Sequence, residues 1–202
     1  MIQLPSIPPD VSFNASIELT QQLLHHLCAS ASVGDVSVGD AAVTNADAMQ
    51  EQAAEEQAIA QAVSALVQSK PGARGFFVAY LTGDQPPPSP PHPAVVTGLK
   101  RAPEQTTDLL TKNLAMSTAM ALTHRRQGSD AMAQQSAQVR SRTLDLIEAL
   151  QMPALAQSLM ALRDSAASAD GTFEAFLTRW GYDEEQRQHI KASADEALGR
   201  LG

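Results

Sequence analysis

The hydrophobic and polar positions of the chain follow a helical pattern, and one stretch stands out, residues 108–126. Apolar or small residues occupy nearly every direction around it between Leu109 and Leu122. A helix without a polar face is usually buried. We therefore expect this stretch to be the central helix of the fold. It ends at Arg125 and Arg126, whose positive charges suit the negative end of a helix dipole.

Apolar residues spaced three or four positions apart predict further helices on both sides of the central one. Their boundaries are set by capping residues, prolines and glycines. Asp183 and Gln186 have the spacing of a capping box, which would start the last helix. The expected helical segments besides the central one are 16–29, 45–68, 76–81, 93–101, 130–151, 153–164, 172–180 and 183–198.

The segment 76–81, FFVAYL, could be a buried strand or two turns of a buried helix, because a short apolar run has no diagnostic period. The sequence offers no second strand to pair with it, and a lone strand leaves its backbone groups without partners. We therefore predict a helix. The preceding Lys70, Pro71 and Gly72 are expected to end the helix before it.

These elements predict an all-α, single-domain bundle of six to eight helices with a buried central helix. The short connection after Arg126 predicts an antiparallel hairpin with the segment 130–151. Residues 1–45 are expected to form an irregular segment and a first helix packed on the bundle, and 46–202 the bundle itself, with a proline-rich connector at 85–93. The residues expected in the core include Leu114, Met120, Leu146, Ile147 and Trp180.

The composition agrees with a soluble helical protein. Hydrophobic residues make up 44% of the 202 residues, whereas aromatic residues, which strands favour, make up 4%. The single cysteine, Cys28, excludes an internal disulfide framework and fits a reducing compartment. The sequence has no secretory signal and no apolar run long enough to span a bilayer. We therefore expect a cytoplasmic protein.

The net charge of −8 is distributed unevenly along the chain. Residues 1–69 contain eight acidic residues and no Lys or Arg, whereas 100–142 contain half of all the basic residues. Such segregation favours charge-steered docking to another protein, and the overall acidity argues against nucleic-acid binding. Both charged regions could also be ordinary solvated surfaces.

The central helix carries the one suggestive group of polar residues. Asn113, Ser117 and His124 fall on a strip of this helix about 60° wide, together with Met120. Polar groups on a buried helix need partners, which could belong to another helix or to a ligand. With nearby cations, an anionic ligand such as a phosphate or carboxylate metabolite is conceivable. The candidate ligand-binding residues are Asn113, Ser117, His124, Lys112, Arg125 and Arg126.

Motifs for catalysis, cofactors and metals are absent from the sequence. It contains no phosphate loop, dinucleotide fingerprint, HExxH, GxSxG or pair of cysteines. His25 and His26 are adjacent, so on a helix they point about 100° apart and cannot form paired metal ligands. We expect no cofactor, no metal and no catalytic residue.

Several stretches resemble an uncharacterised all-helical family of cyanobacteria. They are 112–126 (KNLAMSTAMALTHRR), 140–143 (RSRT), 176–182 (FLTRWGY) and 75–82 (GFFVAYLT). The resemblance covers residues 46–190. It implies a photosynthetic, cyanobacterial host and a cytoplasmic location, and it assigns no activity and no functional residues.

Two functions are compatible with these observations. The first is a non-enzymatic adaptor or regulator that acts through protein–protein interaction. The alternative is a pocket beside the central helix that binds a small anionic metabolite or performs chemistry on it.

Overall fold

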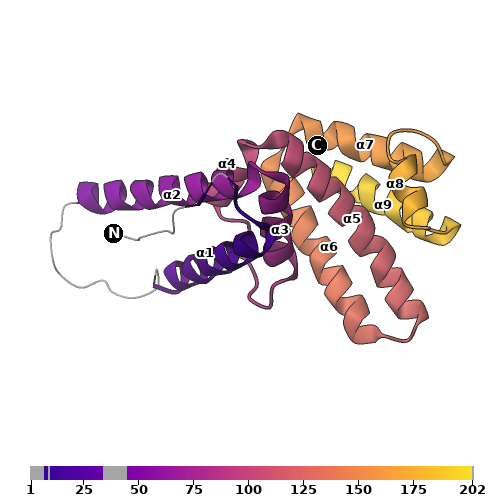
Figure 1. The fold of residues 1–202 in the computed structure, drawn as a ribbon, viewed down its shortest axis with the longest axis horizontal. Coiled ribbons are helices and arrows are strands. Elements are labelled where there is room, and N and C mark those ends of the chain that lie inside the picture. Colours follow the sequence, from indigo (N-terminus) through magenta and orange to yellow (C-terminus); the bar gives the residue numbers. More distant parts are fainter. Residues whose placement is uncertain (1–6, 9, 34–44, 202) are drawn as a thin grey trace. The chain divides into compact units, whose positions relative to one another are not determined.

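The computed structural model describes residues 7, 8, 10–33 and 45–201, and every regular element in this part of the chain is an α-helix (Figure 1). The predicted all-α class is therefore confirmed. The described residues form nine helices, one more than the expected upper limit of eight. Each of the nine lies on a segment that the sequence predicted to be helical, including the two short ones, Pro93–Lys100 (α4) and Glu174–Arg179 (α8).

The helices divide into two compact units, Met1–Gln105 and Thr106–Gly202, which we call the N-terminal and C-terminal units. The boundary that we expected after residue 45 adjoins residues 34–44, which lie outside the described part of the chain. It stays a prediction, as does the loop expected there.

The N-terminal unit contains α1 (Phe13–Val33), α2 (Asn45–Val67), α3 (Lys70–Thr82) and α4. Helix α1 packs on α3, and α2 packs on α4 and α3. The core of this unit consists of leucine, valine and aromatic side chains from all four helices. Its fully buried members include Leu24, Ile59, Val63, Leu66, Phe76, Phe77, Tyr80, Val95 and Leu99.

Two glycines let the helices of this unit approach closely. A Cβ atom on Gly75 of α3 would lie 2.5 Å from the carbonyl oxygen of Phe13 in α1. A Cβ atom on Gly98 of α4 would lie 2.7 Å from the carbonyl oxygen of Ala60 in α2. Neither distance leaves room for a methyl group. The absence of a side chain at these two glycines therefore allows each pair of helices to pack closely.

The segment 76–81 lies in helix α3, as predicted, and all of its residues except Val78 are buried. Helix α2 ends at Val67, close to the predicted residue 68, and Lys70, Pro71 and Gly72, which we expected only to end it, also form the first turn of α3. Ser69 caps this turn, and its Oγ accepts a hydrogen bond of 3.1 Å from the amide of Gly72. Proline suits a first helical turn because its missing N–H would have had no partner there.

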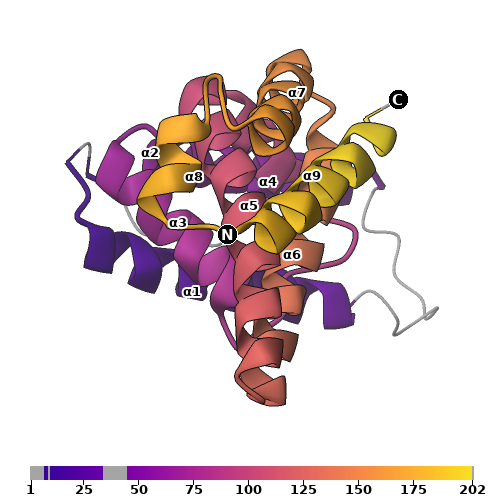
Figure 2. The same cartoon turned by 90° about the vertical axis from the view of Figure 1, so that its right-hand side faces the viewer.

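The C-terminal unit contains most of α5 (Pro103–Arg126), followed by α6 (Asp130–Leu150), α7 (Pro153–Ser168), α8 and α9 (Glu184–Gly199). No residue of α5 between Leu109 and His124 is exposed, so the predicted buried helix is confirmed. Helices α5 and α6 form an antiparallel hairpin through a turn at Gly128, which has a φ of 69°. Figure 2 shows α9 lying across this hairpin.

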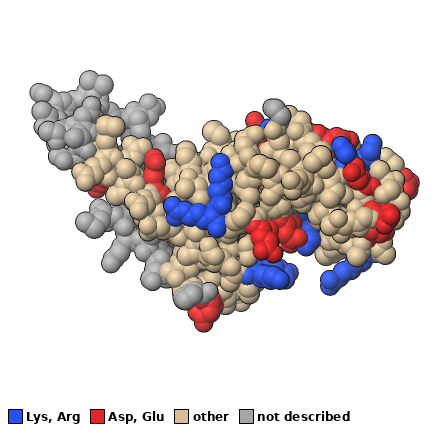
Figure 3. Space-filling model, turned by 90° about the horizontal axis from the view of Figure 1, so that it is seen from above, with Lys and Arg blue, Asp and Glu red and all other residues tan. Residues whose placement is uncertain are grey.

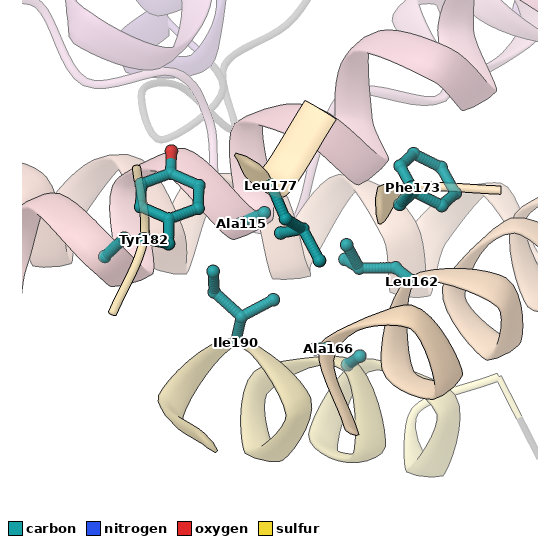
Figure 4. Packing of buried hydrophobic residues seen from close by; sticks show 9 residues of the cluster. Ala115, Leu162, Ala166, Phe173, Leu177, Tyr182 and Ile190 are labelled. Carbon is teal, nitrogen blue, oxygen red and sulfur yellow. The ribbon is translucent and has the colours of Figure 1, made fainter. Parts of the chain in front are cut away.

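Side chains from α5, α7, α8 and α9 meet in one hydrophobic cluster (Figure 4). It includes Ala115, Ala119, Leu162, Ala166, Phe173, Leu177, Tyr182, Ile190 and Ala194. The alanines of α5 leave space for the larger side chains of the other helices.

Three of the five residues expected in the core, Leu114, Leu146 and Ile147, are fully buried. Met120 is half-buried. Trp180 was predicted wrongly, because 51% of its surface is exposed. Helix α8 ends at Arg179, and Gly181, with a φ of 64°, turns the chain so that Tyr182 enters the core instead.

The close packing at Gly98 predicts that Gly98→Ala destabilises the protein by about 1–3 kcal/mol, because the added methyl group overpacks the contact with α2. An alanine is otherwise the better helix former, so a simple propensity effect would have the opposite sign. Urea unfolding followed by circular dichroism measures the change.

Gly199→Ala is the matched control, since a Cβ atom on Gly199 has no neighbour within 4 Å. We expect it to leave stability unchanged or raise it by up to about 1 kcal/mol. Equal stability of the two variants would contradict the close crossing of α2 and α4.

Candidate functional site

The polar residues of the C-terminal unit gather where α9 meets α5 and α6. Helix α9 starts with the predicted capping box, which is confirmed. The Oδ1 atom of Asp183 accepts from the amide of Gln186 at 2.9 Å, and Gln186 Oε1 accepts from the amide of Asp183 at 3.0 Å. The buried Gln186 also donates from Nε2 to Thr123 Oγ1 of α5 at 2.9 Å. A single residue therefore caps α9 and attaches it to α5.

Arg126, the last residue of α5, forms ion pairs with the start of α9. Its Nη1 lies 2.5 Å from Asp183 Oδ2, and its Nη2 contacts Glu185. These hydrogen bonds, to Asp183 first and then Glu185, raise the pKa of Arg126. In return, the hydrogen bond from Arg126 and then that from the Gln186 amide lower the pKa of Asp183. The guanidinium is thus occupied by two carboxylates.

A second polar group lies in the middle of α9, at Ser193. Its hydroxyl oxygen is 2.8 Å from Arg140 Nε in α6 and 3.0 Å from Thr118 Oγ1 in α5. Arg140 also pairs with Glu196, one turn further along α9. Ser193 and Thr118 are both buried, and Arg140 is half-buried. This group therefore joins three helices at one point.

Beside Ser193 the surface is hollowed. The hollow has a volume of about 220 Å³ and opens to solvent between α5, α6 and α9. It is lined by Thr118 and Ser193, and its charged lining residues are Arg125, Arg140 and Glu196. The remaining lining residues are Ala121, Ala137, His189 and Ala192.

Of the six residues predicted to bind a ligand, Arg125 lines this hollow. Ser117 lies on another strip of α5, and its hydroxyl donates to the carbonyl oxygen of Asn113 within the same helix at 2.7 Å. Lys112 pairs with Asp108 at 2.5 Å, and Arg126 is held by α9 as described above.

His124 and Asn113 have no hydrogen-bonded side chain among the described contacts. His124 is buried, and its Nδ1 has no partner in the part of the chain that the structure describes. Asn113 is half-buried. The ligand site predicted on this strip of α5 stays a prediction.

The hollow is not evident from the sequence, although helical spacing contains part of the signal. Thr118 and Arg125 are seven residues apart on α5, and His189, Ser193 and Glu196 follow helical spacing on α9, so each set shares a helix face. Spacing cannot tell which faces of two helices meet. That depends on packing across 75 residues of sequence.

No cluster of three or more His, Cys, Asp or Glu side chains suited to a metal occurs among the described residues. His25 is exposed, and His26 Nε2 lies 2.7 Å from Glu55 Oε1 of α2. In the part of the chain that the structure describes, no helix is long and apolar enough to cross a membrane.

The chain is similar to one family of known sequences. The family model described as uncharacterised conserved protein UCP020893 matches residues 40–197, and the chain belongs to this family. No curated protein and no solved structure matches the chain. The family match extends over α2 to α9 and so includes every residue of the hollow.

A third polar contact of α9 has a pH dependence that can be tested. Arg187 donates from Nη1 and Nη2 to the two oxygens of Glu174 at 2.8 and 2.9 Å, and Thr178 adds a hydrogen bond of 2.5 Å. The bonds from Arg187 and then Thr178 lower the pKa of Glu174 to about 2, from 4.5. A carboxyl group with a lowered pKa stabilises the fold above its unfolded pKa and loses this effect as the pH falls.

We therefore predict that Glu174→Gln is less stable than the parent protein at pH 7 and that the difference disappears between pH 4.5 and pH 2. Urea midpoints measured across this range test the prediction. Glu18→Gln, which changes an exposed carboxylate of α1, is the control and should show no such convergence. A stability difference between Glu174→Gln and the parent protein that stays constant from pH 7 to pH 2 would contradict the prediction. It would mean that the ionised carboxylate contributes nothing to the stability of the fold.

Proposed function

We propose that the protein is a non-enzymatic helical adaptor or regulator that binds another protein, with Trp180 as an anchor of the interface. The observation that supports this function best is the exposure of Trp180. It is the single tryptophan of the chain, and 51% of its surface is exposed at the end of α8.

The surroundings of Trp180 make this exposure informative. Phe173, Leu177 and Tyr182, which lie within seven residues of it, are all buried in the core cluster. The largest apolar side chain of the segment is thus left outside while its neighbours fill the core. Tryptophan and arginine are enriched among the residues that contribute most to binding at protein interfaces. The adjacent Arg179 is exposed and has no ion pair among the described residues.

The distribution of charge supports a partner with a basic surface. On the face drawn in Figure 3, acidic and basic atoms lie next to each other at several places. In the C-terminal unit, Lys112, Arg126 and Arg140 are each paired with carboxylates. In the N-terminal unit, Asp10, Glu18 and Glu51 are exposed. Residues 1–69 contain no Lys or Arg to offset their acidic groups. The unbalanced charge is therefore negative and would steer a cationic partner at low ionic strength.

The overall acidity of the chain supports a function without nucleic acid, because a net charge of −8 opposes binding to a phosphate backbone. We further propose a cytoplasmic location, on the basis of the single cysteine, and a cyanobacterial host, on the basis of the resemblance of the segments 112–126 and 176–182.

The exposure of Trp180 can be tested on the isolated protein. We expect tryptophan emission close to that of the free amino acid in water, with efficient quenching by a neutral quencher, because half of the indole contacts solvent. Blue-shifted emission that resists quenching would contradict the exposure on which the proposed interface depends.

The interface itself is tested by affinity capture from the source organism, with the parent protein and Trp180→Ala compared at low and high salt. We expect a partner that the parent retains at low salt, that raised salt weakens and that Trp180→Ala loses, since truncation of an interface anchor costs about 2 kcal/mol or more. Met49→Ala, which removes an exposed apolar side chain from α2, is the control and should retain the partner. Recovery of the parent protein alone at low salt, or equal retention by Trp180→Ala, would contradict the proposal.

A further inference from the structure

We propose that the hollow between α5, α6 and α9 is a binding site for a small oxyanion, a phosphate or a carboxylate, held by Arg125 and by the Thr118–Ser193 hydroxyl pair. This site is independent of Trp180 and goes beyond the proposed adaptor function.

The Thr118–Ser193 hydroxyl pair has one more proton to donate than it has acceptors in the described part of the chain. Ser193 Oγ accepts a hydrogen bond of 2.8 Å from Arg140 Nε, because an arginine side chain can only donate. The contact of 3.0 Å between Thr118 Oγ1 and Ser193 Oγ uses one of the two hydroxyl protons. The other proton has no acceptor among the described residues, although both side chains are more than nine-tenths buried and line the hollow. A buried donor without an acceptor favours a ligand that brings one.

The charges around the hollow favour an anionic ligand. Arg125 is exposed and has no ion pair or hydrogen bond among the described contacts of its side chain, so its guanidinium can bind a ligand. Arg140 also lines the hollow and donates to Ser193. The one carboxylate of the lining, Glu196, is paired with Arg140 and, at 3.3 Å, with Arg200. Its charge is thus offset on both oxygens, and the lining retains an excess of positive charge.

The size of the hollow selects the class of ligand. Its volume of about 220 Å³ lies below the range of about 300–1,000 Å³ that is typical of sites for drug-sized molecules. Apart from alanines, the lining consists of groups that can form hydrogen bonds or ion pairs. A small ion with several acceptor oxygens matches such a surface better than an apolar ligand does. Phosphate and carboxylate groups both have the planar or tetrahedral edges that a guanidinium binds through two hydrogen bonds.

The site also revises the anion site that we predicted on α5. Both include Arg125, but Thr118 and Ala121 occupy the face that meets α9, whereas Ser117 donates to its own helix. The revised site therefore uses the α5 face toward α9 instead of the strip with Asn113, Ser117 and His124.

The test is an NMR titration with inorganic phosphate at constant ionic strength, in which the ring protons of His189 report on the hollow. Comparison with His189→Gln assigns these signals. We expect saturable shifts of the His189 signals with phosphate and with acetate, which represents a carboxylate ligand. Chloride should produce no saturable shift. Arg125→Gln should weaken phosphate binding about tenfold, because it removes a charge-assisted interaction. Thr118→Val, which keeps the shape of the side chain, should weaken it as well.

Arg179→Gln is the matched control, since it removes an equally exposed arginine of the same unit away from the hollow. It should leave the titration unchanged, and Arg125→Lys should restore part of the affinity lost in Arg125→Gln. The proposal is overturned if His189 shows no saturable shift, if chloride produces the same shift as phosphate, or if Arg125→Gln and Arg179→Gln titrate alike. Capture of a protein partner by the parent chain has no bearing on these outcomes, so the two proposals fail separately.

Discussion

The hydroxyl groups of the buried helix α5 impose the constraint on which the C-terminal unit depends. The polar side chains in the buried part of α5 have little access to water, so hydrogen-bond partners inside the protein stabilise them. Thr111 bonds Ser158 of α7 at 2.9 Å, Thr118 bonds Ser193 of α9, and Thr123 accepts from Gln186 of α9. These three contacts fix the positions of α7 and α9 along α5. Apolar packing by alanine and leucine alone would permit several registers.

The sequence predicted those features that depend on local rules. The all-round apolar pattern of 109–122 identified a buried helix, and the spacing of Asp183 and Gln186 identified a capping box. It did not predict which strip of α5 meets which helix, because Ser117 and Thr118 are both hydroxyl residues on a helix that is apolar or small on nearly all sides, and nothing local says which of them faces α9. One bonds its own backbone and the other bonds α9. The prediction that Trp180 is buried failed for a related reason. Helical spacing places Trp180 on the same face as Leu177, but the chain leaves the helix at Trp180.

The charge counted along the sequence also differs from the charge that the folded unit exposes. Counted along the chain, 100–142 are rich in basic residues, yet the carboxylates that pair with Arg126 and Arg140 come from positions 183, 185 and 196. A window of sequence cannot include partners more than 50 residues away. The positive surface that the count suggests is therefore partly neutralised within the unit, whereas no carboxylate partner of the exposed Arg125 occurs among the described contacts.

The attachment of α9 to α5 has a consequence for the order in which the chain folds. Asp183 and Arg126 are separated by 57 residues, and Ser193 and Thr118 by 75. During synthesis, α5 leaves the ribosome before α6, α7 and α8, whereas the α9 residues that bond Thr118 and Thr123 emerge after all of these helices. Contacts of long sequence separation slow folding, because a large loop must close before they form. The nascent C-terminal unit thus exposes part of an apolar helix until α9 has also been synthesised, so α5 and α9 cannot pack together as α5 emerges.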